Sequence, residues 1–214
     1  MRPPALLLVI ALSVGGAATL RAEVQEPFPW RAHLAHGDVA EIERFARATP
    51  SHPDVPVALA LIAAARGDET AALEALNQAA ANGHPDAALE LGLLFLQLGR
   101  RDEAKAPLEA VIGALTPESD AVAYARAARA VSAIGDPRQA NALYRAAASR
   151  GADQAFIHAW WGDLFLARHE DGEAARAYGD AVARDPRWAP AHLGLAEALA
   201  SSDAAASTAA LERA

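Results

Sequence analysis

The feature that most constrains this chain is a recurrence of small and bulky residues every 34 positions. The stretch HAWWGDLFLARHEDGEAARAYGDAVARDP, at 158–186, carries Gly162, Ala174 and Tyr178 at fixed intervals. A unit of this length cannot bury its apolar face alone, so successive copies are expected to stack into a continuous core. A shift of 34 residues in either direction places these residues on similar ones: Ala128, Ala140, Tyr144 and Ala196.

The register holds without a gap over 121–200 and continues upstream with small slips. Alanine and leucine dominate the apolar residues, which make up 53% of the chain, and both are strong helix formers. Asp136-Pro137 is typical of a helix start, and Gly83-His84-Pro85 of one helix ending and the next beginning. Each unit is therefore predicted to be two helices joined by a turn. The units begin near Pro53, Pro85, Ala121, Ala155 and Ala189.

A helix–turn–helix unit of this length resembles the tetratricopeptide repeat (TPR). The resemblance covers roughly 53–214 and is best in the unit 155–188, although the family's frequent Trp before the first Leu is absent. The segment LNQAAANGHPDAALELGLLF is also similar to the Sel1-like repeat. The resemblance implies an all-α, right-handed α-solenoid of ten to eleven helices, each of about 10–15 residues. The matching small, bulky, aromatic and proline places are Gly162, Phe165, Ala174, Tyr178, Ala181 and Pro186.

The spacing also predicts how the helices pack. Gly162 and Ala174 fall on the facing sides of the two helices of one unit, where small side chains allow close approach. Tyr178 and Ala181 are three residues apart, so they share a face of the second helix. We expect that face to pack against the first helix of the next unit.

The N-terminal region 1–22 has the layout of a secretory signal peptide. Arg2 precedes an apolar run at 5–14 that is too short to span a bilayer, and cleavage fits after Ala18 or Ala22. The alternative is an uncleaved membrane anchor. We therefore expect an exported protein, periplasmic or secreted, without stable membrane insertion once the signal is removed.

Two segments flank the complete repeats. Residues 23–52 are predicted to form a leader and a degenerate first helix, with 23–32 a loose leader anchored by Trp30 and an amphipathic helix at 38–50. The array 53–214 ends in an incomplete unit, SSDAAASTAALERA. A frayed last helix, a partner that covers it, or a longer polypeptide would each account for this end, and we favour the last.

The composition and motifs argue against catalysis within these residues. The chain has no Cys, no Gly-x-Ser-x-Gly elbow and no glycine-rich phosphate loop, so we expect no cofactor and no metal. His33 and His36 are interpreted as solvent-exposed residues of the leader, and His158 and His192 as inter-helix packing residues. With a net charge of −8 and no basic stripe, a nucleic-acid partner is not expected.

Two functions stay open on this basis. The first is a non-catalytic exported scaffold that binds a peptide or protein on the concave face, which the family builds from the first helices of its units. The second is the helical accessory segment of a larger exported enzyme, for example a peptidase, with its catalytic part beyond residue 214. Neither identifies the partner, because fold alone does not specify function.

The predicted partner-binding residues lie in the first helices. Arg129, Asp163 and Glu197 share one place of the repeat, and this place holds Leu61 and Leu93 in the first two units. Such a gradient from apolar to charged would suit an extended peptide, with Gln97 and Arg126 nearby. The alternative is that Arg129 and Asp163 pair with each other across adjacent units and bind no partner.

Overall fold

The computed structural model describes residues 27–214, and the predicted signal peptide therefore lies outside the described residues. The described part is all-helical, as predicted, with no strand. No helix in it is long and apolar enough to cross a bilayer. In chain order the helices are α1 (Trp30–Ala35), α2 (Val39–Ala48), α3 (Asp54–Ala65), α4 (Glu69–Ala81), α5 (Ala87–Gln97), α6 (Arg101–Gly113), α7 (Ala121–Ala133), α8 (Pro137–Ser149), α9 (Ala155–Leu166), α10 (Asp171–Arg184), α11 (Ala189–Leu199) and α12 (Ala204–Leu211).

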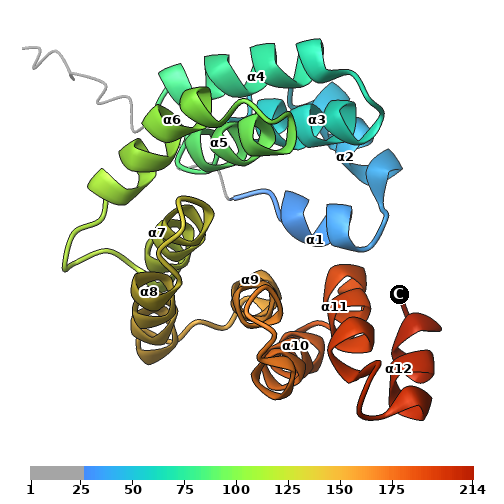
Figure 1. Cartoon of the computed structure of the whole chain (residues 1–214). Helices are drawn as coiled ribbons and strands as arrows, with labels where there is room; N and C mark the ends of the chain where they lie inside the picture. The colour runs from blue at the N-terminus through green and yellow to red at the C-terminus, as the bar shows by residue number, and fades with distance from the viewer. Residues whose placement is uncertain (1–26) are drawn as a thin grey trace, which may run out of the picture.

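The helices pack as successive pairs, α3 with α4 through to α11 with α12, and the array curves round as Figure 1 shows. The first helices of neighbouring pairs are also in contact: α5 contacts α7, α7 contacts α9, and α9 contacts α11. This arrangement is the predicted solenoid of helix–turn–helix units. The described residues form twelve helices where ten to eleven were expected, and α1 and α12, of six and eight residues, are shorter than predicted.

Side-chain caps and left-handed turns set the helix boundaries. Asp136 caps α8 by accepting a hydrogen bond from the backbone N–H of Gln139 at 3.0 Å, and Pro137 opens the helix as predicted. Just before it, Gly135 has a φ of 97°, a conformation that costs glycine little and other residues much more. The same aspartate cap begins α4, α7 and α12 at Asp68, Asp120 and Asp203.

One tyrosine shows how successive units pack. The Tyr178 ring on α10 lies against Gly162 of its own unit and Gly194 of the next, and it is 1% exposed. A Cβ at Gly162 would lie 2.7 Å from the ring, and a Cβ at Gly194 would overlap it. The prediction that Tyr178 packs on the following unit is thus confirmed, and glycine is required on both sides of the ring.

The leader differs from the prediction. Residues 30–35 form α1 where 23–32 were expected to be loose, because Trp30 is 4% exposed and holds the segment against the core. Figure 1 shows α1 between α3 and α11, so it closes the gap between the two ends of the array. His36 Nε2 lies 2.7 Å from Asp185 Oδ2, and Arg187 donates to Asp38 at 3.2 Å.

The expectation that His33 and His36 are solvent-exposed is wrong for the same reason. Their side chains are 24% and 13% exposed. Both are partly covered because α1 sits inside the curve of the array rather than outside it. A prediction from local sequence could not anticipate contacts with residues about 150 positions away.

Candidate functional site

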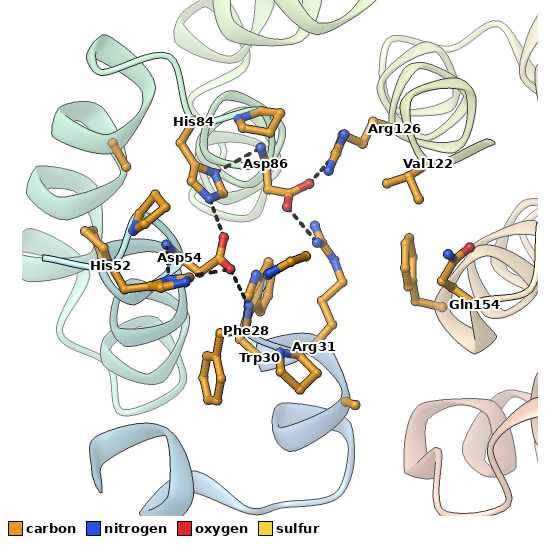
Figure 2. Close-up of a pocket in the computed structure, with 18 of the residues that line it drawn as sticks. Phe28, Trp30, Arg31, His52, Asp54, His84, Asp86, Val122, Arg126 and Gln154 are labelled. Atoms are coloured by element: carbon orange, nitrogen blue, oxygen red, sulfur yellow. Dashed lines mark hydrogen bonds and ion pairs between the residues drawn. The ribbon is translucent and has the colours of Figure 1, made fainter. Parts of the chain in front are cut away.

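A large cavity, with a volume of about 1020 Å³, lies inside the curve of the array. Its wall is built from equivalent positions at the starts of the first helices, because stacking brings these helix ends together. Segment 27–32 forms the opposite wall, as Figure 2 shows. The repeated positions in the lining are Asp54, Asp86, Asp120, Gln154 and Trp188.

Two copies of a His-Pro-Asp motif, at 52–54 and 84–86, position the first two of these aspartates. In each copy the backbone N–H of the Asp donates to Nδ1 of the His, at 3.2 Å and 3.1 Å. The neutral ring then carries its proton on Nε2. His84 Nε2 lies 2.9 Å from Asp54 Oδ1 and donates to it, so the motif of one unit connects to the motif of the preceding unit.

Asp54 also binds the leader. Its Oδ2 accepts a hydrogen bond from the backbone N–H of Phe28 at 2.8 Å. Burial alone would raise the pKa of Asp54, but the hydrogen bonds from His84 and Phe28 lower it overall. The Asp54 carboxylate thus accepts a hydrogen bond from the backbone of a segment outside the repeats, as a group that binds a peptide main chain would.

Asp86 and Glu90, both on the α5 side of the cavity, receive the side chain of Arg31. Arg31 donates to Asp86 Oδ2 at 2.9 Å and to Glu90 Oε1 at 3.1 Å, and Arg126 donates to the other Asp86 oxygen. Burial raises the pKa of Asp86, but the two guanidinium groups outweigh it and hold the pKa at about 2. Burial raises the pKa of Glu90, and Arg31 only partly offsets this.

Aromatic rings complete the surroundings of Arg31. Its guanidinium carbon lies 4.0 Å from the ring centroid of Trp30, 5.1 Å from Phe156 and 5.2 Å from Trp160. These distances fall within cation–π range. We call the four residues around this guanidinium, Asp86, Glu90, Phe156 and Trp160, the arginine subsite. Asp86 and Phe156 line the large cavity, whereas Glu90 and Trp160 do not.

The predicted partner-binding residues all lie on the first helices of their units, but they do not form one site. Leu93, Gln97, Arg129 and Asp163 line a second cavity of about 280 Å³. Arg126 lines the large cavity, while Leu61 and Glu197 line neither.

Arg129 and Asp163 form an ion pair across adjacent units, which is the alternative considered for them. Asp163 also accepts a hydrogen bond from the Tyr178 hydroxyl at 2.8 Å.

Other candidate groups have structural partners. His158 and His192, both buried, each contact a backbone carbonyl six residues earlier, at 3.2 Å and 2.9 Å. Trp161 donates to Asn141 at 2.9 Å. Within residues 27–214, no group of three or more His, Cys, Asp or Glu side chains could hold a metal ion.

Sequence reasoning missed the arginine subsite. Arg31 is a single basic residue in a leader without repeat periodicity, so nothing local marks it. The His-Pro-Asp motif was visible, since it recurs at a spacing of 32 residues, and could have indicated the cavity wall.

Comparison with solved structures identifies the architecture. TTC0263, described as a thermophilic TPR protein in Thermus thermophilus, matches with a TM-score of 0.58 and 22% identity, over 76% of this chain and 92% of that one. The fold is a TPR-like helical repeat. A structure of the human IFIT1 dimer with PPP-AAAA matches this TPR-like fold with a TM-score of 0.58 and 19% identity. That match covers 84% of this chain and 45% of the IFIT1 chain.

No protein-family profile matches the sequence, and no curated protein is significantly similar. The likeness to solved structures therefore describes the fold alone. Fold alone does not specify function, so any residues that would bind a partner must be argued from this chain's own cavity.

Proposed function

We propose that this protein is a non-catalytic, exported scaffold that binds a peptide segment of a protein partner in the large concave cavity. One observation carries the proposal: the cavity wall already binds a peptide segment, the chain's own residues 27–36. That segment is held by a backbone hydrogen bond to Asp54 and by the Arg31 ion pairs. These are contacts that a partner peptide could make equally well.

The chemistry of the lining supports a peptide rather than a small apolar ligand. In the part of the lining that the repeats contribute, aromatic rings from Phe156 and Trp188 lie among carboxylates and guanidinium groups. Aromatic and arginine side chains are enriched where proteins bind each other, because they combine large buried area with directed polar contacts. The accessory-segment alternative would use the same cavity, and the reading frame beyond the codon for Ala214 distinguishes the two.

A peptide selection tests the binding function. The chain contains no Cys, so Gln154→Cys places one fluorophore on the cavity wall and Gly172→Cys places a matched one on α10, outside the lining. Peptides selected from a random displayed library against the full chain should change the signal at position 154, saturably, and leave position 172 unchanged. Selected peptides that alter only position 172 would overturn the cavity as the binding face.

Export is tested separately. The apolar run at 5–14 supports a cleaved signal, so the mature chain should begin after Ala18 or Ala22. Intact-mass measurement of protein recovered from the exported fraction checks this. A mass that still includes Met1 would contradict cleavage.

A further inference from the structure

We propose that the arginine subsite is the specificity subsite of the concave cavity, that it takes an arginine of the partner peptide, and that Arg31 occupies it in cis. The inference rests on the proposed peptide-binding function and extends it in two respects. It names the side chain that the cavity selects. It also makes α1 an internal competitor that a partner must displace.

The geometry of the subsite fits a guanidinium group. Asp86 and Glu90 are both on one side of the Arg31 head group, and each takes a separate nitrogen, at 2.9 Å and 3.1 Å. An arginine presents several N–H donors in a rigid planar fork, whereas the lysine ammonium is a single point charge. Two carboxylates spaced for two nitrogens of one head group therefore favour arginine.

The aromatic wall adds to this selectivity. Phe156 and Trp160 meet edge to face with ring centroids 4.8 Å apart, and both lie near the Arg31 guanidinium. Planar guanidinium groups stack on such rings more favourably than ammonium groups do. The Asp86 side chain is 6% exposed, so its charge lies where solvent screens it weakly and where an unpaired carboxylate would be costly.

The charge of the subsite explains why an occupant is needed. Without Arg31, the buried Glu90 would lose its hydrogen-bonding cation and keep only the charge of Arg129, which is itself paired with Asp163. Asp86 would retain only Arg126. A free cavity would thus hold more negative than positive charge at this point. Either α1 or a cationic partner residue restores the balance, so the two occupants are mutually exclusive.

The attachment of α1 allows exchange. Beyond Arg31, Trp30 and the Phe28 backbone contact, its far end is held by the His36–Asp185 hydrogen bond and the exposed Arg187–Asp38 pair. The helix has only six residues, which is too short to be stable without tertiary contacts. A partner that takes the subsite would release this segment from the cavity.

A competition experiment on the full chain tests the inference. The probe is a labelled synthetic peptide of residues 27–37, PFPWRAHLAHG, and a second version in which Arg31→Ala is introduced. The hosts are the unaltered chain, the Arg31→Ala chain, and Arg176→Ala as a control that removes an exposed arginine on α10. Binding is measured by fluorescence anisotropy.

We expect the arginine peptide to bind the Arg31→Ala chain at least tenfold more tightly than it binds the unaltered or Arg176→Ala chains. On the Arg31→Ala chain we expect the alanine peptide to bind at least tenfold more weakly than the arginine peptide. If the Arg31→Ala chain does not fold, His36→Ala is used instead, because it loosens the other end of α1. The arginine peptide should then bind the His36→Ala chain more tightly than it binds the unaltered chain.

The outcomes separate the subsite from the general function. If both peptides bind the Arg31→Ala chain with equal affinity and change the signal of the fluorophore at position 154, peptide binding stands but the arginine subsite is overturned. If the arginine peptide binds the unaltered chain and the Arg31→Ala chain with equal affinity, the proposal that Arg31 occupies the subsite in cis is overturned. No binding to any host would overturn the inference, while the library selection still decides the function itself.

Discussion

Arg129 and Asp163, at the same place of two successive repeats, form an ion pair across the concave face. Asp163 has a second partner, since it also accepts the hydroxyl hydrogen bond of the buried Tyr178. The two members of the pair therefore do not contribute equally to stability. Removal of Asp163 takes away the ion pair and the acceptor of the buried Tyr178 hydroxyl, whereas removal of Arg129 takes away the ion pair and the contact with the Trp160 ring.

Asp163→Ala should destabilise the protein more than Arg129→Ala. The Asp163 side chain is 44% exposed, so its ion pair contributes about 0–1 kcal/mol. Loss of the acceptor for the buried Tyr178 hydroxyl adds about 1–3 kcal/mol. Urea unfolding measures both variants, and in a Tyr178→Phe background the extra cost of Asp163→Ala should vanish. Equal costs in the unaltered background would contradict this account.

Tyrosine-to-phenylalanine changes should differ between equivalent places of the repeat. The Tyr178 hydroxyl donates to Asp163, whereas the buried Tyr144 hydroxyl lies near the Arg129 guanidinium but forms no hydrogen bond of good geometry among the described residues. Tyr178→Phe should therefore cost about 1–3 kcal/mol, and Tyr144→Phe should be neutral or stabilising. Thermal unfolding of the two variants gives the comparison, and a larger loss for Tyr144→Phe would exclude it.

A single methyl group at Gly194 should separate two units. Gly194→Ala pushes a Cβ into the Tyr178 ring, and overpacking of this kind costs about 1–3 kcal/mol. Gly179 is the matched control, because it lies on the same helix as Tyr178 and has open space around it. Gly179→Ala should stabilise the helix by up to about 1 kcal/mol. Denaturant midpoints that move in the same direction would contradict the packing described.

Acid should remove the contribution of the ionised Asp86 side chain to the free energy of unfolding. Its pKa is about 2 in the folded protein against an ordinary value of 3.8, so its ionised form stabilises the fold by about 2 kcal/mol above pH 4. This stabilisation is lost as the pH falls from about 4 to 2. Glu90 does not add to the loss, because its pKa is raised and it holds its proton in both states over that range.

The measurement is the difference in unfolding free energy between the unaltered chain and Asp86→Asn as a function of pH. The difference should be largest near neutral pH and should shrink below pH 4. Asp102→Asn, at a fully exposed ion pair with Lys105, serves as the control and should show little dependence. A constant difference for Asp86→Asn across the range would mean that its ionisation does not support the fold.

The repeat was predictable from sequence because its packing is local and periodic. The places of Gly162 and Tyr178 recur at 34-residue spacing, so the pattern predicted their packing, whereas Gly194 stands at the repeat place of Trp160 and was not singled out. The docking of α1 was not predictable, because its contacts have no period. His36 contacts a residue 149 positions away, and Arg31 contacts Asp86 and Glu90, which are 55 and 59 positions away.

The same reasoning explains which site residues were found. Arg129 and Asp163 were singled out because they repeat, and they lie together in a small cavity. The arginine subsite combines residues at α5 and on α9, and its occupant Arg31 comes from α1, outside the repeats. Only the curvature of the array brings them together, and curvature depends on small rotations between units that a sequence pattern does not specify.

The His36–Asp185 contact orders events during synthesis. The repeats can fold one upon another as they leave the ribosome, and α1 can dock on Asp54, Asp86 and Glu90 once α5 has been made. Its C-terminal end gains its His36 contact only when residue 185 has been made. At about 5–20 residues per second, the 149 intervening residues take roughly 7–30 s to appear. One end of α1 can therefore be in place early, while its other end completes its contacts only late in synthesis.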